Sequence, residues 1–153
     1  MPEVFRFRWR VRYGECDAQK VVFNARYADY VDLAQTEFLR AIGYDYATFM
    51  RRQLDFQVAK LVLEWQGSAY FDDVLEARVQ ASRVGNTSFT LDFHFVRTGD
   101  GASVCRAQGV YVLMTSEPLQ KIPVPDDLRA ALQCGAPDVV VDHGDTTQRT
   151  ASA

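Results

Sequence analysis

The chain of 153 residues has little of the chemistry on which metal centres and most nucleophilic hydrolases depend. It contains two histidines, and its three cysteines, Cys16, Cys105 and Cys134, fit neither a zinc motif nor a disulfide framework. It has no G-x-S-x-G elbow and no phosphate-binding glycine loop. We therefore expect no metal and no cofactor, and the unpaired cysteines suggest a reducing compartment, by default the cytosol.

Other absences exclude further classes of protein. The 17 Lys and Arg against 20 Asp and Glu leave a net charge of −3, so no basic surplus indicates nucleic-acid binding. No apolar run approaches the ~20 residues of a membrane span. Arginines interrupt the first residues, so we expect no signal peptide.

Residues 4–13 alternate between apolar and basic side chains, which predicts a half-buried strand. Its basic side is the row Arg6, Arg8, Arg10 and Arg12. Such a row is suited to gripping a phosphate, but charges also guard the faces and edges of sheets. We favour the second interpretation.

A helical spacing of apolar residues follows over residues 25–42 and predicts one long amphipathic helix. Asn24 is suited to the N-cap, and Gly43 is suited to ending the helix. Residues 45–53 read as a shorter second helix.

The chain then becomes rich in β-branched and aromatic residues, and turn signals divide this part into successive strands. The expected strands span residues 56–66, 74–83, 87–97 and 103–115. Short turns between them imply antiparallel hairpins. Residues 126–133 read as a terminal helix. We expect a single domain over residues 1–134, and a disordered tail over the polar residues 135–153.

The most informative segment is YGECDAQKVVFNARY at residues 13–27, because it places Asp17 between the first strand and the long helix. Unpaired amides and the helix dipole favour negative charge at a helix N-terminus. A carboxylate beside such an oxyanion site is suited to attack on a carbonyl or thioester. The simpler alternative is that Asp17 only turns the chain.

The order of residues in this segment resembles the signature of the 4-hydroxybenzoyl-CoA thioesterase family. The matching positions are Tyr13, Gly14, Glu15, Cys16, Asp17, Ala18, Val21, Val22, Phe23 and Asn24, followed by Tyr27 and the run Gln35-Thr36-Glu37-Phe38-Leu39-Arg40. The resemblance implies an α+β hot-dog fold, in which an antiparallel five-stranded sheet wraps around one long central helix. It also implies an acyl-CoA thioesterase that releases a free acid and CoA.

The resemblance assigns roles to individual residues. Asp17 attacks the thioester carbonyl or activates water, and the backbone amide of Asn24, or one next to it, holds the carbonyl oxygen. Tyr27 matches a substrate-binding position. The family usually has Gly where this chain has Lys20. If that position has positive φ, Lys20 strains the loop; otherwise its ammonium faces bound phosphates or the Asp17 carboxylate.

Coenzyme A is part of the substrate in this interpretation, so no separate cofactor is needed. The turn that contains Arg83, Asn86 and Ser88 resembles the family segment that meets the nucleotide end of CoA, although it also reads as an ordinary hairpin turn. The resemblance further implies a homodimer and stacking of dimers into a homotetramer. The Asp17 of one subunit would then lie near the turn of the other.

Three other side chains and two other functions remain as alternatives. Glu15 reads as a surface residue, Glu37 as half of a boundary ion pair, and His94 as the only histidine that a Ser-His-Asp or Cys-His site could recruit. A non-hydrolytic acyl-CoA or acyl-carrier-protein binding module is the second functional hypothesis. A hot-dog dehydratase is disfavoured, because no histidine stands in the motif.

Overall fold

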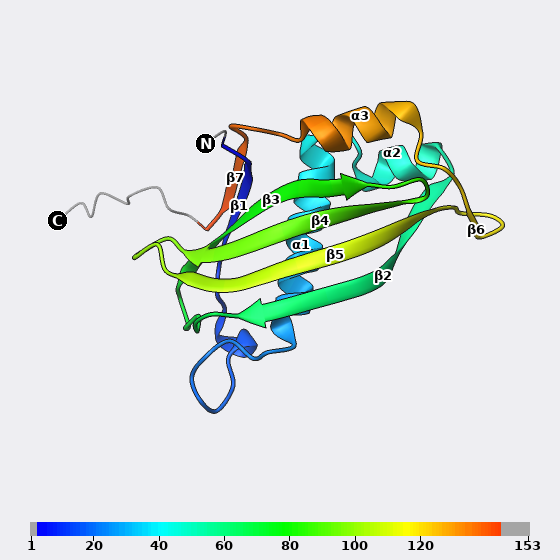
Figure 1. Cartoon of the computed structure of the whole chain (residues 1–153). Coiled ribbons are helices and arrows are strands. Elements are labelled where there is room, and N and C mark those ends of the chain that lie inside the picture. The colour runs from blue at the N-terminus through cyan, green and yellow to red at the C-terminus, as the bar shows by residue number, and fades with distance from the viewer. Residues whose placement is uncertain (1–2, 145–153) are drawn as a thin grey trace.

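One long helix lies against one face of a sheet in the computed structural model, which describes residues 3–144 (Figure 1). The elements in chain order are β1 (Phe5–Arg10), the 3-10 turn η1 (Tyr13–Glu15), α1 (Arg26–Ala41), α2 (Tyr46–Arg51), β2 (Leu54–Trp65), β3 (Val74–Val84), β4 (Ser88–Arg97), β5 (Ser103–Thr115), β6 (Gln120–Lys121), α3 (Asp126–Cys134) and β7 (Val140–His143). Within residues 3–144, no helix is both long and apolar enough to cross a membrane.

The sheet has seven strands in the order β2-β5-β4-β3-β1-β7, with β6 paired to β5. The pairs are antiparallel except β1 with β7, which is parallel. The sheet therefore has two more strands than the five antiparallel strands that we predicted. The prediction missed β6, which has two residues, and β7, which comes from the predicted tail.

The apolar side of β1 and the apolar stripe of α1 form the centre of the core. The aromatic side of β1 and the stripe of α1 are buried against each other through Phe5, Phe7, Trp9, Tyr27, Tyr30, Val31, Ala34 and Phe38. Burying a side chain of this size contributes roughly 1.5–3 kcal/mol, so both elements are stabilised mainly by this contact.

The ends of α1 were predicted with mixed success. Gly43 follows the C-cap with a φ of +92°, as expected of a helix-ending glycine. The N-cap prediction was wrong, because Ala25 occupies that position and no side chain caps the helix. Instead Asn24 lies in a turn that leads into the helix.

The predicted tail boundary was also wrong for residues 135–144. Ala136 is buried, and Val140–His143 form β7, whose backbone pairs with β1. The missed signal is the short run Val139-Val140-Val141, which suits a strand but has no turn-separated partner nearby in sequence. The remainder of the predicted tail, residues 145–153, lies outside the described residues.

The arginine row on β1 binds carboxylates instead of lying free in solvent. Arg8 Nε donates to Glu76 at 2.8 Å, and Glu76 is almost completely buried. Arg10 donates to the backbone carbonyl of Gly144 at 2.9 Å and thereby ties β1 to the end of β7. The row therefore helps to hold the sheet edge together, which the favoured interpretation anticipated only in part.

Candidate functional site

Asp17 lies in a tight hairpin between η1 and α1. Its backbone N–H donates to Val21 O at 2.9 Å, and its carbonyl accepts from Lys20 N at 2.9 Å. Its carboxylate Oδ1 accepts from the backbone N–H of Gln19 at 2.8 Å, which closes an Asx turn. Among residues 3–144, no donor binds Oδ2, and the side chain is half-buried. One carboxylate oxygen is therefore held in place, and the other remains available.

The hairpin is fixed to the body of the protein on two sides. Val22 donates its backbone N–H to Ala69 O at 2.8 Å, in the connection between β2 and β3. Phe23 N–H donates to Glu15 O at 2.9 Å, and Cys16 pairs with Val22 across the hairpin. These bonds set the position of the chain immediately before Asn24.

The backbone amides at the start of α1 include two that bind no protein acceptor. Arg26 N–H donates to Phe23 O at 2.9 Å, and Tyr27 N–H donates to Asn24 O at 3.3 Å, so the chain is already turning. Neither the Asn24 nor the Ala25 amide donates to any acceptor in the described part of the chain. The positive end of the helix dipole lies at the same place. The amides can therefore hold a developing oxyanion, as the sequence implied for Asn24.

Glu15 is more than the surface residue that the sequence suggested. Its Oε1 accepts a hydrogen bond from the Arg12 backbone N–H at 2.7 Å and another from the Tyr30 hydroxyl at 3.1 Å. Burial, the charge of Glu15 and its hydrogen bond raise the pKa of Tyr30. A signal for this contact was present, because a buried tyrosine in the stripe of α1 needs a partner for its hydroxyl.

Lys20 has a φ of +66°, in the left-handed region that favours glycine. Lys20 therefore strains the loop, as expected for a non-glycine residue with positive φ at this position. Lys20 is exposed, and it forms no ion pair with Asp17 in the described part of the chain.

Tyr27 lies in the core beneath the hairpin, with 1% of its surface exposed. Its ring contacts the rings of Tyr30 and Trp65, with centroids at 5.6 Å and 5.8 Å. Burial raises the pKa of its hydroxyl to about 12. Because the Tyr27 side chain is buried, the single chain does not support the predicted direct contact between Tyr27 and substrate.

The predicted nucleotide-binding turn lies far from Asp17. Arg83 is exposed near the end of β3, Asn86 is exposed in the turn, and Ser88 begins β4. The β3–β4 turn is at the right-hand end of the sheet, whereas the loop before α1 is at the lower left (Figure 1). One chain therefore does not bring the two halves of the predicted site together.

Sequence reasoning missed the residue that shapes this turn. Arg129, in α3, donates from its guanidinium to Val84 O at 3.1 Å and to Gly85 O at 2.8 Å. A lone arginine on a helix predicted as terminal carries no pattern that would reveal this contact. The turn is held in one shape by a segment more than forty residues away in sequence.

His94 and Glu37 do not add a second catalytic centre. His94 Nε2 lies 2.9 Å from Ser103 Oγ, but Ser103 also hydrogen-bonds Gln66. Burial and the positive charges of Arg106 and Arg78 lower the pKa of His94, and no carboxylate is among the groups that shift it. Glu37 forms the expected boundary ion pair with Arg40, at 3.3 Å. Among residues 3–144, no group of three or more His, Cys, Asp or Glu side chains could hold a metal ion.

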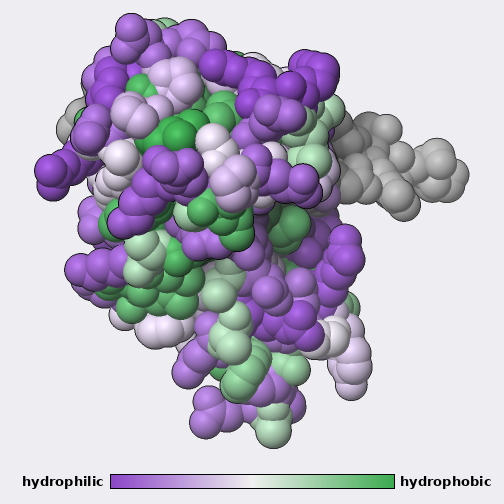
Figure 2. All heavy atoms as spheres, turned by 90° about the vertical axis from the view of Figure 1, so that its right-hand side faces the viewer, coloured by the Kyte–Doolittle hydropathy of each residue, from purple (hydrophilic) through white to green (hydrophobic). Residues whose placement is uncertain are grey.

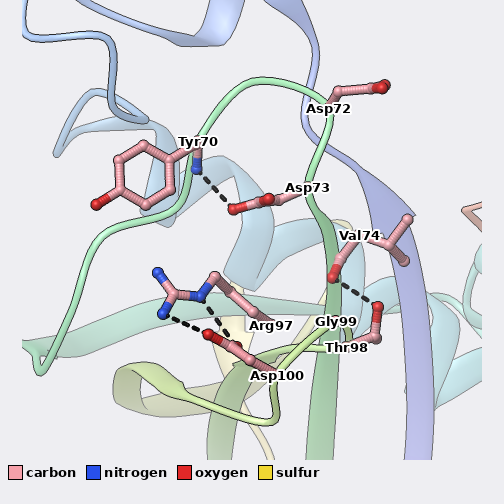
Figure 3. A pocket seen from close by; sticks show the side chains of 8 residues that line it. All are labelled: Tyr70, Asp72, Asp73, Val74, Arg97, Thr98, Gly99 and Asp100. Atoms are coloured by element: carbon pink, nitrogen blue, oxygen red, sulfur yellow. Dashed lines mark hydrogen bonds and ion pairs between the residues drawn. The ribbon is translucent and has the colours of Figure 1, made fainter.

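A hollow of about 630 Å³ lies between the β2–β3 connection and the β4–β5 turn, and none of the predicted site residues lines it. Figure 3 shows the interactions of three of its charged groups, Arg97, Asp100 and Asp73. Arg97 binds Asp100 at 2.9 Å, and Asp73 accepts from the Tyr70 backbone N–H at 2.9 Å. The hollow is a wide surface depression, and the Asp17 hairpin with the start of α1 remains the candidate site.

Comparison with known proteins identifies the family of the chain. The profile of the Thioesterase-like superfamily matches residues 11–132, which include the hairpin, α1 and most of the sheet. The chain belongs to this superfamily. An acyl-CoA thioesterase YbgC of Haemophilus influenzae is 32% identical over 94 residues, which cover 61% of this chain and 69% of that protein. A 1,4-dihydroxy-2-naphthoyl-CoA hydrolase of Synechococcus elongatus is 25% identical over 134 residues, which cover 86% of this chain and 97% of that protein.

Solved structures show that the similarity extends to the fold. The crystal structure of a hypothetical protein from Aquifex aeolicus superposes with a TM-score of 0.78 at 23% identity. The match covers 84% of this chain and 99% of that chain. The chain therefore has the hot-dog architecture that the motif implied, and β7 forms the edge of its sheet beside β1.

Proposed function

We propose that this superfamily member is an acyl-CoA thioesterase that hydrolyses an acyl or aroyl thioester to the free acid and CoA. The proposal is carried by two groups in the segment that leads into α1. One is the half-exposed Asp17 carboxylate with one oxygen unbound, and the other is the pair of Asn24 and Ala25 amides that bind no acceptor among residues 3–144. The relatives named as acyl-CoA thioesterase and 1,4-dihydroxy-2-naphthoyl-CoA hydrolase support the same reaction class.

In the proposed reaction the thioester carbonyl oxygen lies at the start of α1. The Asn24 amide, with the helix dipole behind it, stabilises the negative charge that develops on that oxygen. Asp17 either attacks the carbonyl carbon, forming an anhydride that water then opens, or takes a proton from the attacking water. In both routes the C–S bond breaks and CoA leaves as a thiolate, which then takes up a proton. The Asx turn keeps one Asp17 oxygen fixed while the other reacts.

The proposal includes a homodimer, because a single chain separates Asp17 from the Arg83–Asn86–Ser88 turn. β7 covers the β1 edge of the sheet, so β2 is the long edge strand that remains open to pairing. Apolar side chains of β2 are exposed there, including Val58 and Leu61. A two-fold pairing along β2 would place the turn of one subunit near the hairpin of the other. Stacking of such dimers would give a homotetramer. The free thiols agree with a cytosolic location.

A non-hydrolytic acyl-CoA or acyl-carrier-protein binding module is the second candidate function. The observation in its favour is the Asx turn itself, because a structural role in that turn is sufficient reason for an aspartate at position 17. Such a module would bind a thioester at the amides of α1 without cleaving it.

The deciding experiment is a panel of short, long and aromatic acyl-CoAs with thiol release as the signal, run on the wild type and on Asp17→Asn. Asparagine can keep the Asx turn but cannot act as base or nucleophile, so we expect kcat to fall by ~100-fold or more with little change in Tm. Asp126→Asn, in the exposed first turn of α3, is the matched control and should retain full activity. An Asp17→Asn variant with near wild-type kcat would contradict the mechanism. Binding of acyl-CoA without any thiol release would favour the binding module.

A further inference from the structure

A second hollow lies where α1 and η1 meet the edge of the sheet that β1 and β7 form (Figure 1). Its volume is about 540 Å³, and small-molecule sites span roughly 300–1,000 Å³. Neither Asp17 nor Asn24 lines it. The strand β2, which we propose as the dimer edge, lies at the other end of the sheet. The hollow is therefore separate from both the candidate active site and the proposed pairing surface.

Aromatic rings form most of the apolar lining of this hollow. Phe7 and Trp9 of β1 are buried, and their rings stack with centroids 5.3 Å apart. Tyr13 of η1 and Phe71 of the β2–β3 connection meet edge to face at 6.0 Å, although they are 83% and 56% exposed. Leu33 lines the hollow from α1. Ring faces and ring edges arranged in this way suit a flat aromatic ligand.

Arg12 supplies a charged group without a partner at the same hollow. Its side chain is exposed, and its guanidinium makes no hydrogen bond or ion pair with any group of residues 3–144. Other charged groups of the lining are engaged. Arg10 donates to the Asp72 carboxylate at 3.3 Å, and the Glu15 carboxylate accepts from the Tyr30 hydroxyl and a backbone N–H. An anionic ligand can therefore bind Arg12 without displacing an existing partner.

Trp9 adds a buried donor beneath the hollow. It is 6% exposed, and its indole N–H has no hydrogen-bond partner among residues 3–144. Burial and Glu15 raise the pKa of the Tyr30 hydroxyl, and the indole N–H is close enough to lower it, but no hydrogen bond of normal geometry joins the two groups. An unsatisfied donor at this place favours a ligand with oxygen acceptors over a plain hydrocarbon.

Exposed apolar surface alone does not make such a site. Figure 2 looks onto the opposite end of the molecule, where apolar surface is also exposed among polar side chains. A groove of about 210 Å³ lies between α1, α2 and the start of β2, with Met50 in its lining. None of the described residues that line this groove carries a positive charge. The groove therefore offers a matched control for the hollow.

From these observations we propose that the hollow is a binding site for a small aromatic carboxylate. The ring of the ligand packs against Tyr13, Phe71 and the buried rings of β1, and its carboxylate pairs with the Arg12 guanidinium. Such a ligand covers the exposed rings of Tyr13 and Phe71 and supplies the acceptors that Arg12 and the Trp9 indole lack. The site does not depend on the proposed thioesterase function, because neither Asp17 nor a thioester takes part in it.

Calorimetric titration of the full-length protein with 2-naphthoate tests the ligand class. We expect a Kd of about 1 mM or lower. The neutral analogue 2-naphthamide should bind about tenfold more weakly, because it loses the charge-assisted bond to Arg12. Decanoate keeps the charge but lacks the ring, so it should also bind several-fold more weakly. Equal affinities for all three compounds would contradict the proposal.

Two variants with matched controls test the place of binding. Arg12→Gln should weaken binding of 2-naphthoate about tenfold, whereas Arg51→Gln, at an exposed arginine of α2, should not. Leu33→Trp fills the hollow from the surface of α1 and should abolish binding. Met50→Trp is its control, because the two side chains are 49% and 50% exposed and Met50 lines the other groove.

The Trp9 indole reports the occupied site directly. Trp65→Phe leaves Trp9 as the only tryptophan, so one indole N–H resonance remains in the NMR spectrum. We expect 2-naphthoate to shift this resonance and Asp17→Asn to leave its Kd unchanged. Three results would overturn the proposal: no binding at 10-fold above the expected Kd, unchanged binding in Leu33→Trp, or binding that Asp17→Asn weakens and Arg12→Gln does not. The last result would place the carboxylate in the candidate active site.

Discussion

The hydroxyl of Tyr30 donates a hydrogen bond to the Glu15 carboxylate, with 3.1 Å between the oxygens. The bond joins the buried face of α1 to η1, two residues before Asp17. Glu15 also accepts the Phe23 amide through its backbone carbonyl at 2.9 Å, directly before Asn24. The same residue therefore helps to position both the carboxylate and the oxyanion amide of the proposed reaction.

Replacing Tyr30 with phenylalanine removes this bond and leaves the aromatic ring in the core. We expect a loss of stability of about 1 kcal/mol and a decrease in Tm of about 2–4 °C. We also expect kcat to fall several-fold with little change in KM, because the hairpin is less well positioned while the binding surfaces remain. Thermal melts and acyl-CoA kinetics measure the two effects.

Tyr44→Phe is the matched control, because Tyr44 is also buried and also donates to a carboxylate, that of Asp127. It lies at the other end of α1, so it should lower Tm without lowering kcat. Equal kcat losses in the two variants would mean that general stability, and not the position of the hairpin, controls turnover.

Local patterns were enough to predict most of the elements. The alternation through Phe5, Phe7 and Trp9 gave β1, and the helical stripe gave α1 to within a residue or two. The misses depend on contacts between distant segments. β7 exists because Val140–His143 can pair with β1, about 135 residues earlier, and no local period reveals such a pairing.

The sequence was enough to point to candidate residues of the site, but not to show how they are arranged in space. The motif pointed to Asp17 and to the amide of Asn24. The structure places Asp17 in the hairpin that leads into α1 and shows no acceptor for the Asn24 amide among residues 3–144. The motif could not show that Tyr27 is buried or that Glu15 binds Tyr30, because both depend on how α1 packs against the sheet.

Lys20→Gly should stabilise the protein. A non-glycine residue in the left-handed region costs roughly 1–2 kcal/mol, and glycine removes this cost while losing up to ~1 kcal/mol to the greater entropy of the unfolded chain. We expect a net increase in Tm of a few degrees, measured by thermal denaturation. Lys20→Ala keeps the strain and removes the ammonium, so its Tm should stay near that of the wild type.

The same pair of variants separates strain from charge in substrate binding. If the Lys20 ammonium meets the phosphates of CoA, both variants should raise KM to a similar extent. A KM that rises in neither variant would assign Lys20 no role in substrate binding. A Lys20→Gly variant that melts below the wild type would contradict the argument from strain.

Light scattering should show a dimer or larger assembly at micromolar concentration, because β2 is an open edge with apolar side chains exposed. Val58→Glu should weaken the assembly by placing a charge in the pairing surface, and thiol release should fall with it. Val140→Glu, on β7, is the matched control at the opposite edge of the sheet. A stable wild-type monomer with full activity would show that one chain suffices for the site.

Removing the chain after Gly135 should destabilise the protein, since β7 belongs to the sheet. The truncation removes the buried Ala136, the backbone bond from Arg6 N–H to Val139 O at 3.0 Å, and the bond from Arg10 to Gly144 O at 2.9 Å. Each such bond contributes about 1 kcal/mol, so we expect Tm to fall by several degrees. It also reopens the β1 edge, so the truncated protein should aggregate more readily. Truncation after Gly144 is the control: it keeps β7 and removes a sequence without an apolar run, so Tm should change little. An unchanged Tm after truncation at Gly135 would mean that β7 contributes little to the fold.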